Sequence, residues 1–354
     1  MNSTPEQEPT NEEGGQLNEV ASTTSSTADT SLPEVHPPSA GFILQLFVIP
    51  MVIVAVVVSI VLLFNMLATS ASAPELVRNL KRLNEGSWQD AFNLSLLLQN
   101  PDNIDLKQDK ELAAELISVL RGEIKQGKTE PTRIRLRMFV CKCLGEFTIE
   151  DPIDPLIDAA LHEKDLKDLD VRRAAIESLA LLINNIGPEK LVTNRHLEET
   201  LIKLTLESST TEEDVSRDEV KSAATFALGV LGSDNALETL RSLTHSAHSN
   251  TRYNAATGLA RHGDLAAKNV LLEMLDPDNP FIKEDESKES LQVMRRDILI
   301  GNALRATMNL ADSHDIEELS DLIEAMKALE SADVSTQVGL AAKEAVLQLE
   351  QSQN

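Results

Sequence analysis

The chain has 354 residues, and its 57 acidic and 32 basic side chains give it a net charge of −25. This charge argues against nucleic acid as a partner, because phosphate binding rests on clustered lysine and arginine. Aromatic residues make up only 3% of the chain, and alanine and leucine dominate instead. That composition favours closely packed helices over a β-sandwich.

Residues 1–40 form a polar segment with seven acids and no lysine or arginine. Serine, threonine, glutamate, proline and asparagine supply most of it. Such a segment cannot bury enough apolar surface to order itself. We therefore expect residues 1–40 to be a disordered acidic tail.

An uncharged stretch of 40 residues, Val35 to Pro74, overlaps the end of the tail and is almost wholly apolar from Phe42 to Ala68. A bilayer core about 30 Å thick needs about 20 apolar helical residues. A cleaved signal peptide fits less well, since it would have a basic start and an apolar core of about 7–15 residues. The pattern predicts a single transmembrane helix over residues 41–68.

The first basic side chains of the chain come directly after this stretch, at Arg78, Lys81 and Arg82. Positive residues near a membrane stay on the cytoplasmic side. We therefore expect the tail outside, a juxtamembrane linker or helix over residues 69–84, and a cytoplasmic domain beyond it.

One pattern recurs after Pro74: a loop, a cation, then alanine and leucine at helical spacing. In its clearest copy, Asp170 to Ala180, the apolar positions follow the i, i+3, i+4, i+7 rule of a helix with one buried face. Each such helix is preceded by another apolar helical stretch, so the repeating unit is a helical hairpin. The aligned copies begin at Arg137, Arg172, Lys221, Arg252, Asp297 and Gly339, and Trp88 to Leu98 forms a degenerate first copy.

The run Asp-Val-Arg-x-x-Ala-Ala-x-x-Leu within these copies resembles the HEAT-repeat family. The resemblance implies an all-α fold, an α-solenoid of six or seven stacked hairpins over residues 85–350. It also implies a scaffold that binds protein partners through its helices. The spacing between copies is less regular than in clean members of the family.

The first position of the aligned helices carries a cation four times in succession, at Arg137, Arg172, Lys221 and Arg252. Asp297 follows in the fifth copy. The residues two positions earlier, Asp170, Glu219 and Asn250, can accept charge-assisted hydrogen bonds from the same or an adjacent cation. Two interpretations stay open: a structural ladder that ties repeats together, similar to that of the HEAT family, or a cationic stripe that receives an acidic partner.

The sequence contains no Gly-rich phosphate loop, no G-x-S-x-G and no H-E-x-x-H. The only cysteines, Cys141 and Cys143, are expected to be buried structural thiols. His245 and His248 are expected in an ordinary polar turn rather than in a metal site.

We therefore expect a non-catalytic, membrane-anchored scaffold that binds protein and needs no cofactor. The alternative is a HEAT-like lyase that handles a prosthetic group, which would need a reactive cysteine or histidine in its groove.

Overall fold

The computed structural model describes residues 41, 49–67, 72–209, 216–283 and 288–351. Every regular element within these ranges is a helix, as the composition predicted. The chain divides into two compact units, Met1–Ser70 and Ala71–Asn354.

The first unit contains α2 (Ile49–Leu67), a largely apolar helix whose described side chains are exposed. Among the residues that the structure describes, no helix is both long and apolar enough to cross a membrane. The predicted transmembrane helix over 41–68 is therefore not confirmed. Residues 42–48 and the predicted tail, 1–40, lie outside the described residues.

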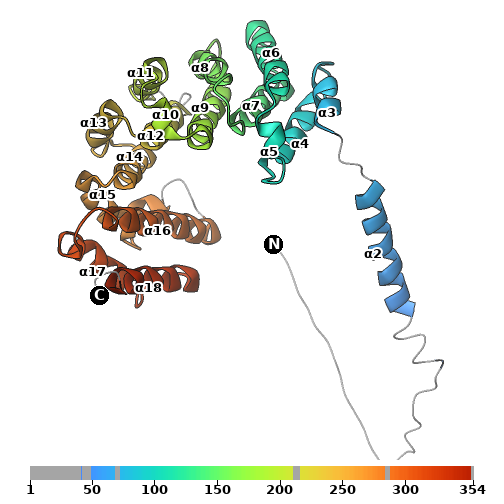
Figure 1. Ribbon diagram of the computed structural model, residues 1–354. Helices are drawn as coiled ribbons and strands as arrows, with labels where there is room; N and C mark the ends of the chain where they lie inside the picture. The colour runs from blue at the N-terminus through green and yellow to red at the C-terminus, as the bar shows by residue number, and fades with distance from the viewer. Residues whose placement is uncertain (1–40, 42–48, 68–71, 210–215, 284–287, 352–354) are drawn as a thin grey trace, which may run out of the picture. The chain divides into compact units, whose positions relative to one another are not determined.

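The second unit is a curved stack of helical hairpins (Figure 1). The first helices of the hairpins are α3 (Ala73–Leu80), α6 (Lys110–Gln126), α8 (Ile153–Leu161), α11 (Arg195–Leu204), α13 (Asp234–Leu243), α15 (Lys268–Leu275) and α17 (Ser320–Ala328). Their second helices are α4 (Ser87–Gln99), α7 (Pro131–Gly145), α9 (Asp168–Ile186), α12 (Ser216–Leu231), α14 (Ser249–Arg261), α16 (Glu289–Ala311) and α18 (Thr336–Gln351). The connections include α5 (Ile104–Lys107), α10 (Pro188–Leu191), η3 (Leu265–Ala267), η4 (Pro280–Lys283) and η5 (Ile316–Leu319).

Each second helix packs against the next second helix, so these helices form an inner layer that runs through the stack. The first helices lie on the convex side (Figure 1). The described residues thus contain seven hairpins, the upper of the two counts that the sequence allowed. The stack also begins earlier than residue 85, because α3 packs against α4 and α6 and so completes the first hairpin.

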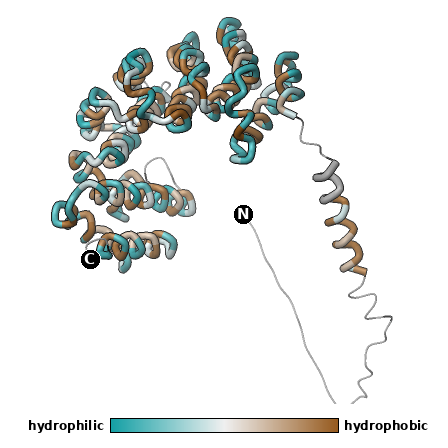
Figure 2. The backbone as a smooth tube through the Cα atoms, viewed as in Figure 1, coloured by the Kyte–Doolittle hydropathy of each residue, from teal (hydrophilic) through white to brown (hydrophobic). Residues whose placement is uncertain are grey.

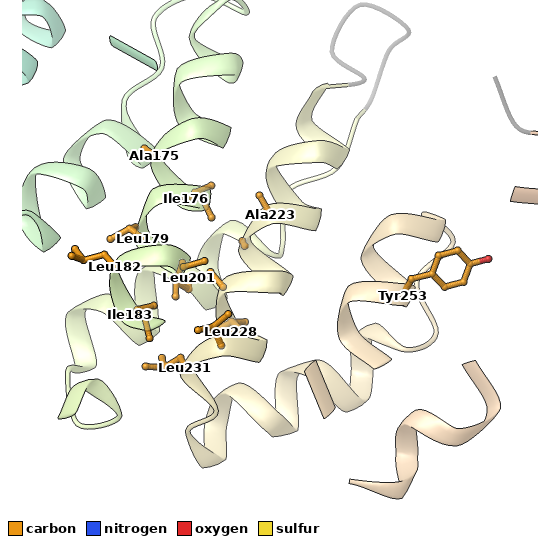
Figure 3. Packing of buried hydrophobic residues seen from close by; sticks show 14 of the residues in the cluster. Ala175, Ile176, Leu179, Leu182, Ile183, Leu201, Ala223, Leu228, Leu231 and Tyr253 are labelled. Carbon is orange, nitrogen blue, oxygen red and sulfur yellow. The ribbon is translucent and has the colours of Figure 1, made fainter. Parts of the chain in front are cut away.

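The hydrophobic pattern of each helix decides which face it buries. Along α9, the residues that recur three or four positions apart on one face are buried. Glu177 and Leu181 on the other face are exposed. Figure 2 shows the resulting alternation of polar and apolar segments through the second unit. Figure 3 shows side chains of α9, α11 and α12 meeting in this core, among them Ile176, Leu179, Leu182, Ile183, Leu201, Leu228 and Leu231.

Capping residues set several helix boundaries. The side chain of Asp109 accepts hydrogen bonds from the backbone N–H groups of Glu111 and Leu112 at the start of α6, which satisfies donors that have no partner within the helix. The same helix ends at Gly127, whose φ of 60° lies in the left-handed region that favours glycine.

The inner layer packs closely because small residues face one another between hairpins. Gly229 of α12 and Gly258 of α14 meet backbone to backbone: a Cβ on Gly229 would lie only 2.7 Å from the Cα of Gly258. A Cβ on Gly145 of α7 would lie 2.9 Å from the Cα of Ser178. Polar contacts bridge the same helices, since Asn254 donates to the carbonyl oxygen of Ser222 at 3.0 Å.

Two glycine-to-alanine substitutions should change stability in opposite directions. Gly229→Ala forces α12 and α14 apart and should lower the free energy of unfolding by about 1–3 kcal/mol. Gly301→Ala adds a Cβ in α16 that meets nothing within 4 Å, so it should raise stability by about 0.5–1 kcal/mol. Thermal and chemical denaturation of both variants measure the difference. A Gly229→Ala protein as stable as the Gly301→Ala protein would contradict this packing.

Candidate interaction surface

The predicted cations Arg137, Arg172, Lys221 and Arg252 lie on α7, α9, α12 and α14, one on each of four successive second helices. Their environments differ. The side chains of Arg137 and Arg172 are only 1% and 3% exposed, while those of Lys221 and Arg252 are half-buried.

Arg137 is fully buried and bridges two hairpins. Its Nη1 donates to Oδ1 of Asp168, the first residue of α9, at 2.9 Å, and its Nη2 donates to the carbonyl oxygen of Lys128 at 2.8 Å. Asp168 also accepts from the backbone N–H of Lys164 at 2.9 Å. Burial alone would raise the pKa of Asp168, but this backbone hydrogen bond and the Arg137 guanidinium outweigh it and hold that pKa below its ordinary value.

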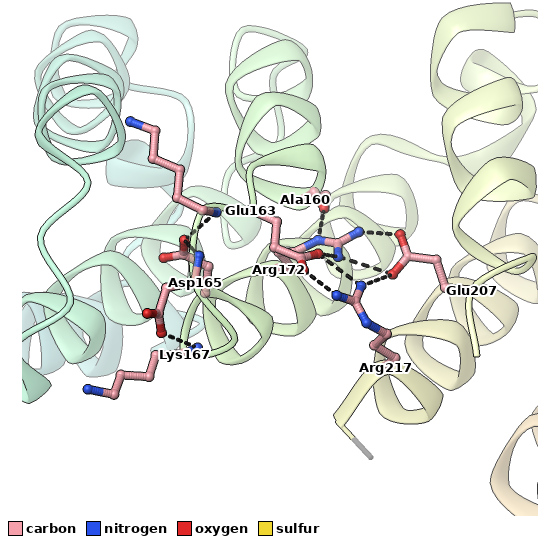
Figure 4. A network of polar contacts seen from close by, with 9 residues as sticks. Ala160, Glu163, Asp165, Lys167, Arg172, Glu207 and Arg217 are labelled. Atoms are coloured by element: carbon pink, nitrogen blue, oxygen red, sulfur yellow. Dashed lines mark hydrogen bonds and ion pairs between the residues drawn. The ribbon is translucent and has the colours of Figure 1, made fainter. Parts of the chain in front are cut away.

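Arg172 lies at the centre of a four-charge network (Figure 4). Its Nε donates to the carbonyl oxygen of Ala160 at 2.7 Å. Its two Nη atoms donate to the carboxylates of Glu163, after α8, and Glu207, after α11. Arg217, in the first turn of α12, pairs with the same two carboxylates. Two positive and two negative groups therefore join the turns of the third and fourth hairpins.

Arg252 repeats this arrangement further along the stack. Its Nε and Nη2 lie 3.1 and 2.6 Å from the two carboxylate oxygens of Glu273 on α15, and its Nη1 donates to the carbonyl oxygen of Ser246 at 2.7 Å. The hydroxyl of Tyr253 also donates to Glu273, at 2.8 Å. Burial would raise the pKa of Glu273, but the hydrogen bonds from Arg252 and Tyr253 lower it below its ordinary value.

These three arginines share one geometry. Each donates to a backbone carbonyl of its own hairpin and to a carboxylate of the following hairpin, namely Asp168, Glu207 or Glu273. The acceptors therefore differ from the expected Asp170 and Glu219. Residues two apart on a helix point in different directions, which leaves Asp170 exposed next to the buried Arg172. These carboxylates lie outside the repeated motif, so its alignment did not indicate them.

The other members of the column do not share this geometry. Among the described residues, no carboxylate forms an ion pair with Lys221. Glu219 instead accepts from the side-chain amide of Asn250 at 3.3 Å, across α12 and α14. Asp297 is half-buried on α16, and its Oδ1 has no hydrogen-bond partner among the described residues.

A cleft of about 660 Å³ lies between α12, α14, α16 and η4. One wall carries Leu291, Met294 and Ile298 of α16, which are 36%, 54% and 56% exposed. The facing wall is polar and includes Glu219 and Asn254. The cleft thus combines exposed apolar side chains with polar groups, the composition typical of binding sites.

The thiols of Cys141 and Cys143 are completely buried, as expected of structural cysteines. Burial raises the pKa of Cys141 to about 12 and also raises that of Cys143, so both thiols stay protonated. His248 contacts Thr251 through Nδ1 at 2.9 Å. The described residues contain no cluster of histidine, cysteine and acidic side chains that could hold a metal ion.

A family model described as HEAT repeats matches residues 212–291, a stretch that includes α13, α14 and α15. The match covers less than a quarter of the chain, and together with the hairpin stack it supports a HEAT-like solenoid. No curated protein sequence matches the chain. A crystal structure of an engineered protein from the Northeast Structural Genomics Consortium is similar, with 17% identity and a TM-score of 0.38 over 78% of this chain and 68% of that one. A score of this size does not establish a shared fold.

Replacing Arg172 should destabilise the stack, whereas replacing its neighbour should not. Arg172→Met leaves the Ala160 carbonyl without its side-chain donor and leaves Arg217 as the remaining partner of the two carboxylates, and should lower the free energy of unfolding by about 2 kcal/mol. The matched control, Arg173→Met, removes an exposed cation 3.8 Å from Glu177 and should cost less than about 0.5 kcal/mol. Chemical denaturation measures both values. Equal stabilities of the two variants would contradict a structural role for the network.

Proposed function

We propose that this protein is a non-catalytic scaffold that binds a protein partner on the inner layer of its HEAT-like solenoid. The observation that carries the proposal is the cleft between α12, α14 and α16, whose apolar wall is open. HEAT repeats generally mediate contacts between proteins, and exposed apolar residues grouped in a cleft are typical of such contact sites. The polar wall supplies hydrogen-bonding groups that fix the position of a bound segment.

We further propose that Arg137, Arg172 and Arg252 form a structural ladder rather than a partner stripe. The low exposure of the first two supports this assignment, because a buried guanidinium cannot meet a partner. Their carboxylate partners on the following hairpin support it too. Lys221 stands outside the ladder.

The alternative function, a lyase that handles a prosthetic group, has less support. It needs a reactive thiol or imidazole in a groove. Both cysteines are completely buried, and burial keeps both thiols protonated. The nucleophile would be the thiolate, so neither cysteine is available. His248 does line the cleft, where its Nδ1 contacts the hydroxyl of Thr251.

Attachment to a membrane, with the tail outside and the solenoid in the cytoplasm, is the remaining part of the proposal. Its support is the uncharged stretch Val35 to Pro74 and the basic residues that follow it. Such an anchor would keep the solenoid and its partner at the membrane surface.

A photo-crosslinking residue in the cleft tests the scaffold function. Benzoylphenylalanine at Met294 should crosslink to a discrete protein in intact cells, which mass spectrometry identifies. The control position is Ile104 in α5, which is 59% exposed against 54% for Met294. Introducing Ile298→Asp should abolish the adduct, because it places a charge on the apolar wall. Identical adducts from both positions, or none from Met294, would refute the cleft as the binding site.

Cell fractionation tests the membrane attachment. The full chain should stay in the membrane pellet after alkaline carbonate extraction, and deletion of residues 42–67 should release it. Protease added to spheroplasts should trim the tail and spare the solenoid. Release of the full chain by carbonate would rule out an anchor, while degradation of the solenoid would invert the topology.

A further inference from the structure

A second group of exposed and half-buried side chains lies on the inner layer at the other end of the stack, over α4 and α7; Trp88 and Phe139 are the half-buried members. We name it the aromatic–cation patch: Trp88, Phe92, Leu96, Arg135, Phe139 and Lys142. Phe139 stacks against Trp88 with ring centroids 6.3 Å apart and meets the edge of Phe92 at 5.3 Å. Arg135 and Lys142 lie over the Trp88 and Phe139 rings, at 5.4 and 5.5 Å from their centroids.

The patch stays open although it is largely apolar. Phe92 and Leu96 are 39% and 49% exposed. The chain has few aromatic residues, 3% of the total, yet it places three of them together on this surface. Contacts between exposed rings and cations are individually weak. Such contacts order the side chains but do not cover them.

The charge of α7 is the second unusual feature. The helix carries four cations and no acid in a chain of net charge −25. Two of the cations serve the fold: Arg133 pairs with Glu123 at 3.3 Å, and Arg137 pairs with Asp168. The other two, Arg135 and Lys142, are exposed, and no carboxylate of the described residues forms an ion pair with either.

We propose that the aromatic–cation patch binds an acidic segment of a partner protein that also carries aromatic or aliphatic side chains. Arg135 and Lys142 would pair with its carboxylates, while the aromatic rings and Leu96 would cover its apolar side chains. This inference rests on the proposed scaffold function and adds a second contact site to the cleft. A protein segment is favoured over a lipid surface because the patch lies on the inner layer of a curved stack (Figure 1), which cannot lie flat on a bilayer.

Charge complementarity supports this choice of partner. Positive groups that stay exposed on an acidic protein attract an acidic segment to one place, while the rest of the surface repels it. Aromatic residues and arginine are also enriched where protein interfaces bury most of their binding energy.

The only tryptophan of the chain lies in the patch, so intrinsic fluorescence of the full chain in a neutral detergent reports on it directly. The probe is a synthetic peptide, acetyl-Glu-Glu-Phe-Glu-Glu-Leu-Glu-amide, compared with the same peptide carrying Lys in place of Glu. We expect a saturable change in Trp88 emission with the acidic peptide that weakens as salt is added, and no such change with the lysine peptide.

Charge-reversal variants locate the binding. Arg135→Glu combined with Lys142→Glu should weaken the acidic peptide roughly tenfold or more, because like charges then face each other. Arg121→Glu combined with Lys125→Glu, two exposed residues of α6, changes the net charge by the same amount and should leave the affinity unchanged. Should the variant of Arg135 and Lys142 fail to fold by circular dichroism, Arg135→Gln with Lys142→Gln replaces it.

Three results would overturn the proposal. The first is no saturable change in Trp88 emission up to about 1 mM acidic peptide, the weak limit of specific binding, and the second is equal affinity of the charge-reversed protein for that peptide. The third is a change in Trp88 emission with phosphatidylserine vesicles at a lower concentration than with the peptide. The last would identify a lipid surface instead. Crosslinking from Met294 is independent of these results, so loss of this site and loss of the scaffold function are distinguishable.

Discussion

The close approach of successive second helices is the constraint on which the other features of the second unit depend. At Gly229 and Gly258 the two backbones touch, and a Cβ on either glycine would have to displace the neighbouring helix. Gly145 meets Ser178 in the same way between α7 and α9. Because only small residues occupy these contacts, the inner layer is continuous, and large apolar residues pack between the inner and outer helices instead. A larger residue at such a contact would change the distance between hairpins and therefore every contact that bridges them.

The arginine contacts follow from that spacing. When hairpins are close, the turn of one hairpin lies within reach of a long side chain from the one before. Arg137 thus meets Asp168, and Arg172 meets Glu207. A buried guanidinium is costly unless it is paired, and here each arginine also donates to a backbone carbonyl. Nε of Arg137 is the exception, since it is buried and has no hydrogen-bond partner among the described residues. These contacts neutralise several of the acids in a chain with a large negative charge.

The same architecture separates the groups that serve the fold from those that are available to partners. Side chains directed between helices become buried, as Arg172 shows, while those directed away from the stack stay exposed, as Phe92 and Met294 show. The cleft at α16 and the aromatic–cation patch at α7 lie in different hairpins of the inner layer. A long solenoid can in this way carry two proposed sites of different chemistry: a cleft with one apolar and one polar wall, and an aromatic patch with two exposed cations. Binding of one partner at both sites would raise its effective affinity without new contacts at either site.

The sequence by itself determined the all-helical class, the hairpin repeat and the positions of the second helices. Copies aligned on Arg137, Arg172, Lys221 and Arg252 each fall on one of these helices, because helical periodicity and small-residue spacing are local properties. It did not indicate α3 as part of the stack, since that helix has only two turns and its packing depends on α4 and α6.

Tertiary structure alone decided the environment of each cation. Arg135 and Arg137 are two residues apart and chemically identical, yet one is exposed over Trp88 and the other is buried against Asp168. The partners lie in other helices, so nothing in the local sequence separates the two. For the same reason the sequence did not predict that Glu207 and Glu273 lie beside their arginines. Ion pairs between hairpins depend on how the hairpins stack, whereas the repeated motif describes residues within a single hairpin.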